Sequence, residues 1–177
     1  MSNKIVKLTL ILFLICAVTA GILGGVNAWT APKIAERAAQ KTAEAYAAVL
    51  AAPGFAEASY DKEGHPTVSK VDAATDGSGW VVTSTFSGAQ GSITMLTGVN
   101  ADFTCSGIAI TAHSETSGLG ANAASTGEVG INFRAQFVGA TESITIGDID
   151  ALTGATITSK AVTNAVAESI KTCKTVG

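Results

Sequence analysis

The hydrophobic pattern divides the chain into a long uncharged stretch near its start and a region of shorter periodic segments. No Asp, Glu, Lys or Arg occurs between Leu8 and Pro32. A helix of about 20 apolar residues crosses the ~30 Å hydrocarbon layer of a bilayer, so this stretch is long enough to span it. Residues 33–52 are rich in alanine, with partial helical spacing of their apolar positions. We expect a stalk helix here that ends at Pro53-Gly54.

Charges beside the uncharged stretch predict its orientation. Lys4 and Lys7 precede it without any acidic residue, so the positive-inside rule places the N-terminus in the cytoplasm and the rest of the chain outside. Trp29 suits an interfacial anchor. A cleaved signal peptide is the alternative, because Val26-Asn27-Ala28 resembles a small-x-small cleavage site. The apolar run exceeds the usual 7–15 residues of a signal peptide, which favours a retained anchor.

Beyond residue 54 the pattern predicts an α+β domain. Residues 55–78 are polar and contain Gly and Asp, with a turn near His65-Pro66. Residues 114–130 indicate a long loop or a loop–helix element. A C-terminal helix is expected, with Ile157, Ala161, Ala165 and Val166 on one side and Val162 and Ile170 adjacent to them. Alternating or β-branched runs predict strands at 80–86, 92–99, 103–112 and 143–146, and a short helix is expected at 133–137. We expect an antiparallel sheet packed with helices, and three parts: 1–32 as cytoplasmic tip and transmembrane helix, 33–54 as stalk and 55–177 as the domain.

Composition excludes several classes of function. A net charge of −3 and a pI near 5.3 disfavour a nucleic-acid binder. The sequence has no CxxC motif and two histidines, which argues against zinc, iron–sulfur, haem and His-rich metal sites, and against a Ser/His/Asp or Cys/His catalytic set. Cys16 is expected to face the membrane or pack on a helix. Cys105 and Cys173 either form a disulfide or are buried as small hydrophobic residues.

The segment Asp150-Ala151-Leu152-Thr153-Gly154-Ala155-Thr156 is the most informative one for chemistry. Gly154 and Ala155 are small and let a bulky partner approach the backbone. Thr156 places a hydroxyl at the start of the predicted helix, where free N–H groups and the helix dipole favour a phosphate. Thr158 and Ser159 add hydroxyls in the first turn. The alternative is that Thr156 or Thr158 is an ordinary N-cap.

This segment resembles the D-x-x-[S/T]-G-A-T motif of the FMN-binding domain family. Four more segments extend the resemblance in order along the chain: Ala52-Pro53-Gly54, Gly79-Trp80-Val81-Val82, His113-Ser114-Glu115-Thr116-Ser117-Gly118-Leu119-Gly120 and Phe133-Arg134-Ala135-Gln136-Phe137. The sequence departs from the family at Ser117, where the family has Pro, and in the looser turn at residues 87–91.

The resemblance implies an FMN that is bonded through its phosphate to the Thr156 hydroxyl by a phosphodiester. A separate flavin transferase makes this bond, and Asp150 is expected to help it recognise the site. The loop residues Glu115 and Thr116 are expected to hydrogen-bond the ring or the ribityl chain. Further contacts are expected from residues that shape the turn, bind the phosphate or cover the isoalloxazine: Thr153, Gly154, Ala155, Thr158, Ser159 and Leu119. His113 is expected to end a strand, and Trp80 to lie in the core.

With its membrane segment and short length, the chain most resembles the G-subunit family of Rnf-type ion-translocating electron transport complexes. The resemblance implies a single-pass protein of the cell (inner) membrane with its domain on the extracytoplasmic side. Its FMN would pass electrons between other membrane subunits, with no substrate-transforming site of its own. Two alternatives stay open: a stand-alone anchored flavoprotein for extracellular electron transfer, and a non-redox anchored domain whose threonine-rich turn caps a helix.

Overall fold

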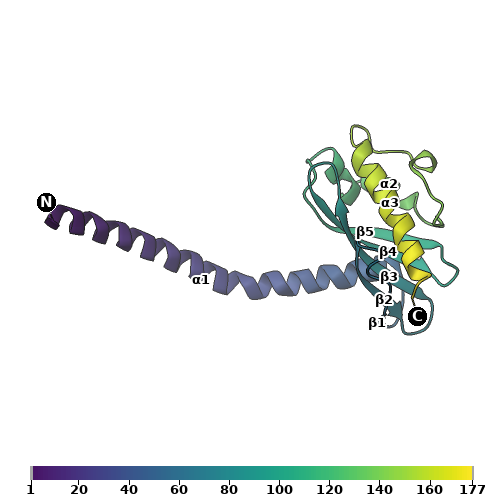
Figure 1. Ribbon diagram of the computed structural model, residues 1–177, viewed down its shortest axis with the longest axis horizontal. Coiled ribbons are helices and arrows are strands. Elements are labelled where there is room, and N and C mark those ends of the chain that lie inside the picture. The colour runs from purple at the N-terminus through teal and green to yellow at the C-terminus, as the bar shows by residue number, and fades with distance from the viewer. Residues whose placement is uncertain (1, 177) are drawn as a thin grey trace. The chain divides into compact units, whose positions relative to one another are not determined.

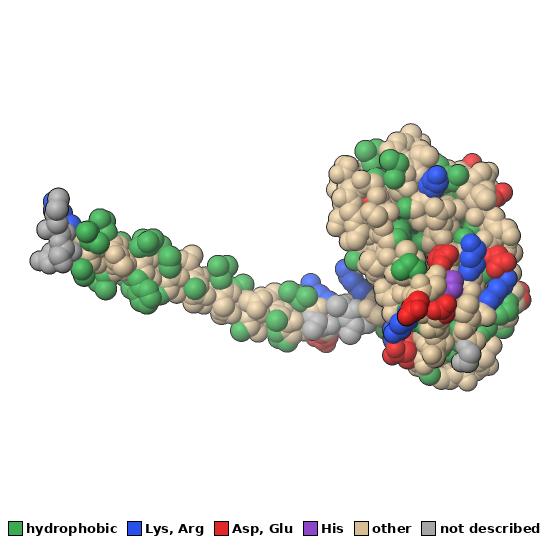
Figure 2. All heavy atoms as spheres, in the orientation of Figure 1, with side chains coloured by type: hydrophobic (Ala, Val, Ile, Leu, Met, Phe, Trp, Pro, Cys, Tyr) green, Lys and Arg blue, Asp and Glu red, His purple; other side chains and the backbone are tan. Residues whose placement is uncertain are grey.

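A computed structural model of the protein describes residues 2–176 and shows two compact units, with the boundary between Lys41 and Thr42. Helix α1 (Ser2–Val49) runs without interruption through the first unit and ends in the second, with Pro32 inside it (Figure 1). The expected membrane helix and stalk helix are therefore one continuous helix. The segment Lys4–Ile34 is long and apolar enough to cross a membrane. Figure 2 shows hydrophobic side chains along the length of this segment.

The second unit is built on a five-stranded antiparallel meander in which each strand pairs with the next in sequence. The predicted strands at 80–86, 92–99 and 103–112 are confirmed, and the α+β class with them. Two strands in residues 55–78 were missed, where the prediction was an irregular polar segment. The strands are β1 (Phe55–Glu57), β2 (Val68–Ala74), β3 (Gly79–Ser87), β4 (Ser92–Asn100) and β5 (Cys105–His113).

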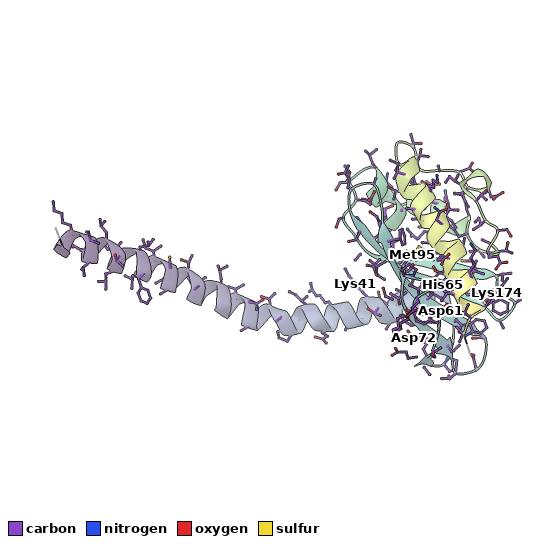
Figure 3. The ribbon with its side chains drawn as sticks, viewed as in Figure 1. Lys41, Asp61, His65, Asp72, Met95 and Lys174 are labelled. Atoms are coloured by element: carbon purple, nitrogen blue, oxygen red, sulfur yellow. The ribbon has the colours of Figure 1, made fainter. Side chains whose placement is uncertain are left out.

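The two faces of the sheet are buried by different helices. Val82 and Met95 point to one face and form a core with helix α3 (Thr156–Cys173). Their neighbours Val81 and Leu96 point to the other face and pack against the end of α1. This alternation is the period-2 geometry of a strand. Figure 1 shows α3 lying across the sheet, and Figure 3 labels Met95 in this region.

Helix α3 confirms the predicted C-terminal helix but corrects its buried face. Ala165 and Val166 are buried as expected, and so are the adjacent Val162 and Ile170, whereas Ile157 is 67% exposed. The prediction counted only apolar residues, yet much of the buried face carries hydroxyls. Four of them donate to the carbonyl four residues earlier: Ser159, Thr163, Ser169 and Thr172.

Shorter elements complete the domain: the 3-10 helices η1 (Gly120–Ala124) and η2 (Ile146–Asp148), and helix α2 (Glu128–Ala135). The expected short helix at 133–137 exists, but it begins five residues earlier than predicted. The predicted strand at 143–146 is wrong. Thr145 and Asp148 form a capping box that turns this segment into η2, and a local hydrogen-bonded turn of this kind outweighs β propensity.

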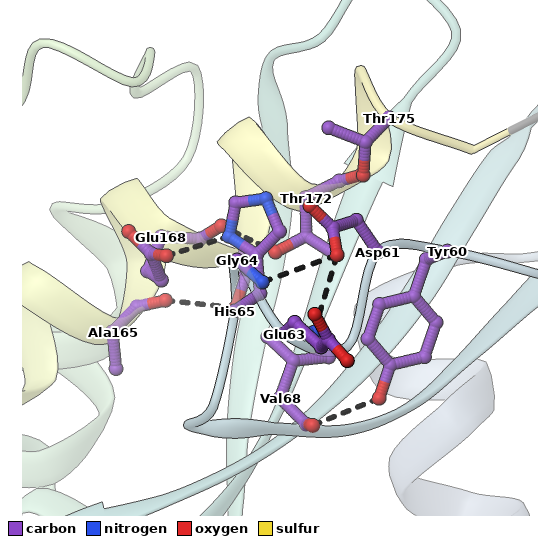
Figure 4. Close-up of polar contacts among 11 residues, drawn as sticks. Tyr60, Asp61, Glu63, Gly64, His65, Val68, Ala165, Glu168, Thr172 and Thr175 are labelled. Carbon is purple, nitrogen blue, oxygen red and sulfur yellow. Dashed lines mark hydrogen bonds and ion pairs between the residues drawn. The ribbon is translucent and has the colours of Figure 1, made fainter.

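Loop 58–67 is held to both the sheet and α3. Tyr60 donates its hydroxyl to the Val68 carbonyl at 2.8 Å, and His65 Nδ1 lies 2.6 Å from Glu168 Oε1 on α3 (Figure 4).

Both domain cysteines, Cys105 and Cys173, are free and buried, and burial raises the pKa of each thiol to about 12. The disulfide alternative is therefore not adopted.

The end of α1 is fastened to the sheet by polar contacts and by close packing. Tyr46 donates its hydroxyl to the buried Asp72 carboxylate at 2.7 Å, and Lys70 Nζ lies 2.8 Å from the other oxygen of that carboxylate. The Val49 carbonyl accepts a hydrogen bond from Ser106 Oγ. A Cβ on Gly98 would lie 2.2 Å from that same carbonyl oxygen, so only glycine admits this approach.

We predict that Gly98→Ala lowers the free energy of unfolding by about 1–3 kcal/mol, the usual cost of overpacking a tight site. Gly107 is the matched control because it pairs with Gly98 in the sheet, and a Cβ there would meet its nearest atom, the Ala48 carbonyl oxygen, at an ordinary 3.6 Å. Gly107→Ala should therefore leave stability nearly unchanged. Urea unfolding followed by circular dichroism measures both, and equal stabilities for the two variants would contradict the packing argument.

Candidate functional site

The turn before α3 depends on one glycine for two reasons. Gly154 has φ +73°, a left-handed conformation that glycine adopts without strain. A Cβ on Gly154 would also lie 3.0 Å from Leu119 Cδ2, so the loop after β5 packs against this turn. The Ala155 amide closes the turn by donating to the Leu152 carbonyl at 2.9 Å. The sequence Thr153-Gly154-Ala155 thus forms a compact turn that leads directly into the helix.

Thr156 is the first residue of α3 and its side chain is exposed. Its hydroxyl has no hydrogen-bond partner among residues 2–176. The N-cap of the helix is Ala155, with no side-chain cap, so the interpretation of Thr156 or Thr158 as an N-cap is wrong. The first amides of α3 therefore keep their hydrogen-bonding capacity for an anion beside the Thr156 hydroxyl.

The next two hydroxyls of α3 are buried and already paired within the protein. Ser159 Oγ accepts from the Leu152 amide at 3.0 Å and donates to the Ala155 carbonyl at 3.0 Å, which ties the turn to the helix. Thr158 Oγ1 donates to Glu115 Oε2 at 2.5 Å. The expectation that these two hydroxyls bind a phosphate stays a prediction. In the structure, Ser159 binds the backbone of the turn and Thr158 binds Glu115.

Glu115 is a buried carboxylate, 8% exposed, at the start of the loop after β5. Its Oε1 accepts from the Gln90 amide at 3.0 Å, in the turn between β3 and β4. Burial raises the pKa of Glu115, but hydrogen bonds from Thr158 and from the backbone of residues 89–91 outweigh it and hold the pKa below its usual value. Because the folded pKa is depressed, this carboxylate stabilises the fold above its unfolded pKa, and that contribution is lost as the pH falls through the folded value.

The loop from Thr116 to Ala124 is ordered by its own backbone and by Arg134. The Thr116 carbonyl accepts from the amides of Leu119 and Ala121, both at 3.2 Å. Arg134 Nη1 on α2 donates to the carbonyls of Ala123 and Ser125 at 2.6 and 2.9 Å. Leu119 remains 44% exposed beside Gly154, and the Thr116 side chain faces solvent.

Gln136 is a site residue to which the sequence interpretation assigned no role. Its Oε1 accepts from the Asp150 amide at 2.7 Å and its Nε2 donates to the Asp150 carbonyl at 3.3 Å. The amide thereby pairs with the backbone of the turn segment while the Asp150 side chain stays exposed. The signal for this role was the Phe133–Phe137 segment, in which Gln136 is the uncharged polar residue between two buried aromatic rings.

A groove of about 620 Å³ runs between α2 and the turn before α3, and we call it the α2 groove. Apolar residues line it together with amide residues, a threonine and the acidic Asp150; among them are Leu119, Val129, Asn122, Asn132, Gln136 and Thr153. Apolar walls with a few convergent polar groups are typical of a site for a small aromatic ligand. A flat heteroaromatic ring with a hydrogen-bonding edge fits this chemistry.

Of the site residues predicted from the sequence, Leu119, Asp150 and Thr153 line the groove. The others lie outside its lining: Glu115, Thr116, Gly154, Ala155, Thr156, Thr158, Ser159, Trp80 and His113. Trp80 stacks on Phe103 with ring centroids 5.3 Å apart and belongs to the core, as predicted. His113 ends β5, and its Nδ1 accepts from the Glu115 amide at 3.3 Å. The remaining sequence-predicted residues gather at the turn before α3 and at the loop facing it.

Comparison with known proteins adds independent information about the whole chain. Residues 88–171 match the FMN-binding domain family, and residues 1–49 match the RnfG N-terminal region. The chain is 34% identical to the G subunit of the ion-translocating oxidoreductase complex of Methanosarcina acetivorans over 96% of its own length and 94% of that protein. The chain belongs to the RnfG family.

Two further relatives come from ferredoxin:NAD(+) oxidoreductase complexes. The G subunit of the Na(+)-translocating complex of Acetobacterium woodii is 35% identical over 93% of this chain and 89% of its own. The G subunit of the proton-translocating complex of Clostridium ljungdahlii is 38% identical over 52% of this chain and 51% of its own. Membership in the RnfG family confirms the resemblance inferred from the motifs.

We predict that Gln136→Ala loosens the turn segment, because the Asp150 amide and carbonyl both lose their side-chain partner. Each neutral hydrogen bond contributes about 1 kcal/mol net, so amide exchange at Asp150 should quicken by about fivefold or more. Asn132→Ala is the matched control: this amide lines the same groove on α2 and has no hydrogen-bond partner among residues 2–176. Hydrogen exchange measured by NMR or mass spectrometry decides, and unchanged exchange in Gln136→Ala would refute the role.

Proposed function

We propose that this chain is the membrane-anchored FMN-carrying subunit of an Rnf-type ion-translocating electron transport complex. In this proposal FMN is bonded through its phosphate to Thr156 by a phosphodiester that a flavin transferase makes. The observation that carries it is the exposed, unpaired Thr156 hydroxyl at the first residue of α3. This hydroxyl stands within a sequence segment that matches the attachment motif of the family.

The residues around Thr156 fit an FMN. The uncapped amides at the start of α3 and the positive end of the helix dipole suit the phosphate. The α2 groove offers Leu119 and Val129 for an apolar ring face and Asn122 and Asn132 for a hydrogen-bonding ring edge. Bound FMN would supply one- and two-electron transfer, while these side chains bind and orient it and limit its access to water.

The N-terminal helix supports membrane anchoring. Its apolar side chains are exposed within the chain, as expected for contact with lipid or with other membrane helices. The hydroxyls of Thr9, Thr19 and Thr30 each donate to the carbonyl four residues earlier, so they need no partner in an apolar environment. The positive-inside rule applied to Lys4 and Lys7 favours a cytoplasmic N-terminus and an extracytoplasmic domain.

The relatives support a role inside a larger assembly. The names of three relatives describe the G subunit of an ion-translocating complex, and two of those complexes are ferredoxin:NAD(+) oxidoreductases. The partners we propose are the other membrane subunits of such a complex. An anchor confines the domain beside them and raises its effective concentration, which keeps electron-transfer distances short. Co-purification of those subunits with the full chain would separate this role from that of a stand-alone flavoprotein.

We predict that the full chain, co-expressed with a flavin transferase, exceeds its sequence mass by one FMN less one water. Peptide mapping should place the added mass on Thr156. Thr156→Ala should lose the mass and the yellow colour completely, because no hydroxyl remains to form the phosphodiester. Thr126→Ala, which removes another exposed threonine hydroxyl, is the control and should keep both. Unmodified wild-type mass, or flavin retained in Thr156→Ala, would disprove the attachment.

Thiol labelling in a Cys16→Ser background tests the predicted topology, with a cytoplasmic N-terminus and an extracytoplasmic domain. Cys105 and Cys173 are buried with a raised pKa, so they should not react while the domain is folded. A membrane-impermeant maleimide added to spheroplasts should label Lys62→Cys in the domain and leave Lys4→Cys unlabelled. Labelling of Lys4→Cys alone would show that the orientation is the opposite of the proposed one. Recovery of the chain in the soluble fraction would refute anchoring.

A further inference from the structure

The Glu115 carboxylate lies in a cradle formed by two glycines. A Cβ on Gly88, in the turn after β3, would lie 2.3 Å from Glu115 Oε1. A Cβ on Gly120, at the start of η1, would lie 2.1 Å from Glu115 Oε2. Real Cβ atoms do not approach oxygen this closely, so glycine at both positions leaves the space that the carboxylate occupies. The position of this carboxylate is therefore determined by the fold.

The same carboxylate links three segments that are distant in sequence. One oxygen accepts from the Gln90 amide of the β3–β4 turn, and the other accepts from Thr158 Oγ1 in the first turn of α3. Glu115 itself begins the loop that carries Leu119. Hydrogen bonds to an ionised group are roughly twice as strong as neutral ones, so this link resists displacement more than an apolar contact would.

Two contacts join the loop after β5 to residues on either side of Thr156. Leu119 packs against Gly154, two residues before Thr156, and Glu115 binds Thr158, two residues after it. Both contacts join the loop after β5 to the segment that presents the Thr156 hydroxyl. Of these two contacts, the Glu115–Thr158 link is buried, whereas Leu119 is partly exposed.

We propose that Glu115 is a positioning residue for the cofactor on Thr156: through Thr158 it holds the first turn of α3 and the Leu119 loop in one fixed relation. This inference rests on the proposed function and goes beyond it, because it assigns Glu115 to the scaffold rather than to direct contact with the flavin. The two glycines, the two hydrogen bonds and the burial of the carboxylate together support it.

The test compares full-length variants co-expressed with a flavin transferase. Glu115→Gln keeps the shape and removes the charge, whereas Thr158→Val keeps the shape and removes the hydroxyl. In both, we expect amide exchange in residues 116–124 to quicken by roughly tenfold, as for loss of one hydrogen bond to a charged group. We also expect the visible circular dichroism and the midpoint potential of the bound flavin to shift. Thr158→Ser restores the hydroxyl and should behave as the wild type does.

The matched control is Asp102→Asn in the β4–β5 turn. Asp102 also accepts hydrogen bonds from a threonine hydroxyl and a backbone amide, both of Thr104, but it makes no contact with α3 or the Leu119 loop among the hydrogen bonds of residues 2–176. This variant should leave the flavin signals unchanged. The double variant Glu115→Gln/Thr158→Val should shift them no further than either single variant, because both remove the same link.

The outcomes separate this inference from the proposed function. A wild-type chain without the FMN mass would refute the proposed function. If every variant carries FMN and both single variants keep the wild-type potential and circular dichroism, the positioning role is overturned, even where exchange or stability changes. If Glu115→Gln fails to fold, the Thr158→Val and Thr158→Ser pair decides, since those variants differ in the hydroxyl that binds Glu115.

Discussion

The packing of α3 against the antiparallel sheet is the interaction on which the rest of the structure depends. Val162, Val166 and Ile170 are completely buried and form a core with side chains such as Val82 and Met95 on the facing sheet. The helix begins at Thr156, so the same apolar contacts that stabilise the domain also set the position of that hydroxyl. A site on a helix packed in this way is held more rigidly than one on a free loop.

The buried face of α3 carries several hydroxyl groups, and hydrogen bonds within the helix allow them to lie in an apolar core. Thr163, Ser169 and Thr172 donate to carbonyls of their own helix, which satisfies them without help from the sheet. Thr158 differs, because its hydroxyl turns away from the helix backbone and binds Glu115. One member of this polar face thereby becomes a connection between the helix and the loop opposite it.

The parts of the fold that were predictable are those with a local signature. Strands β3, β4 and β5 carry β-branched and apolar runs between turn residues, and α3 follows a helical period. Strand β2 escaped prediction because Lys70 and Asp72 make it look like a polar loop, and the buried Asp72 pairs both with Lys70 and with the distant Tyr46. The mistaken strand at 143–146 has the opposite cause, since the hydrogen bonds between Thr145 and Asp148 impose a turn on β-prone residues.

The sequence by itself determined the membrane-length helix, the α+β class, the position of Thr156 at the start of a helix and the family to which the chain belongs. These follow from the length of the uncharged stretch, the periodicity of the apolar residues and a contiguous motif, which are all local properties of the sequence. Only the tertiary structure decided that Gln136 holds Asp150 and that Glu115 holds Thr158, because these partners are 14 and 43 residues apart. The pattern of apolar residues along the chain does not reveal such contacts, because they form only once the meander and α3 bring the separate segments together.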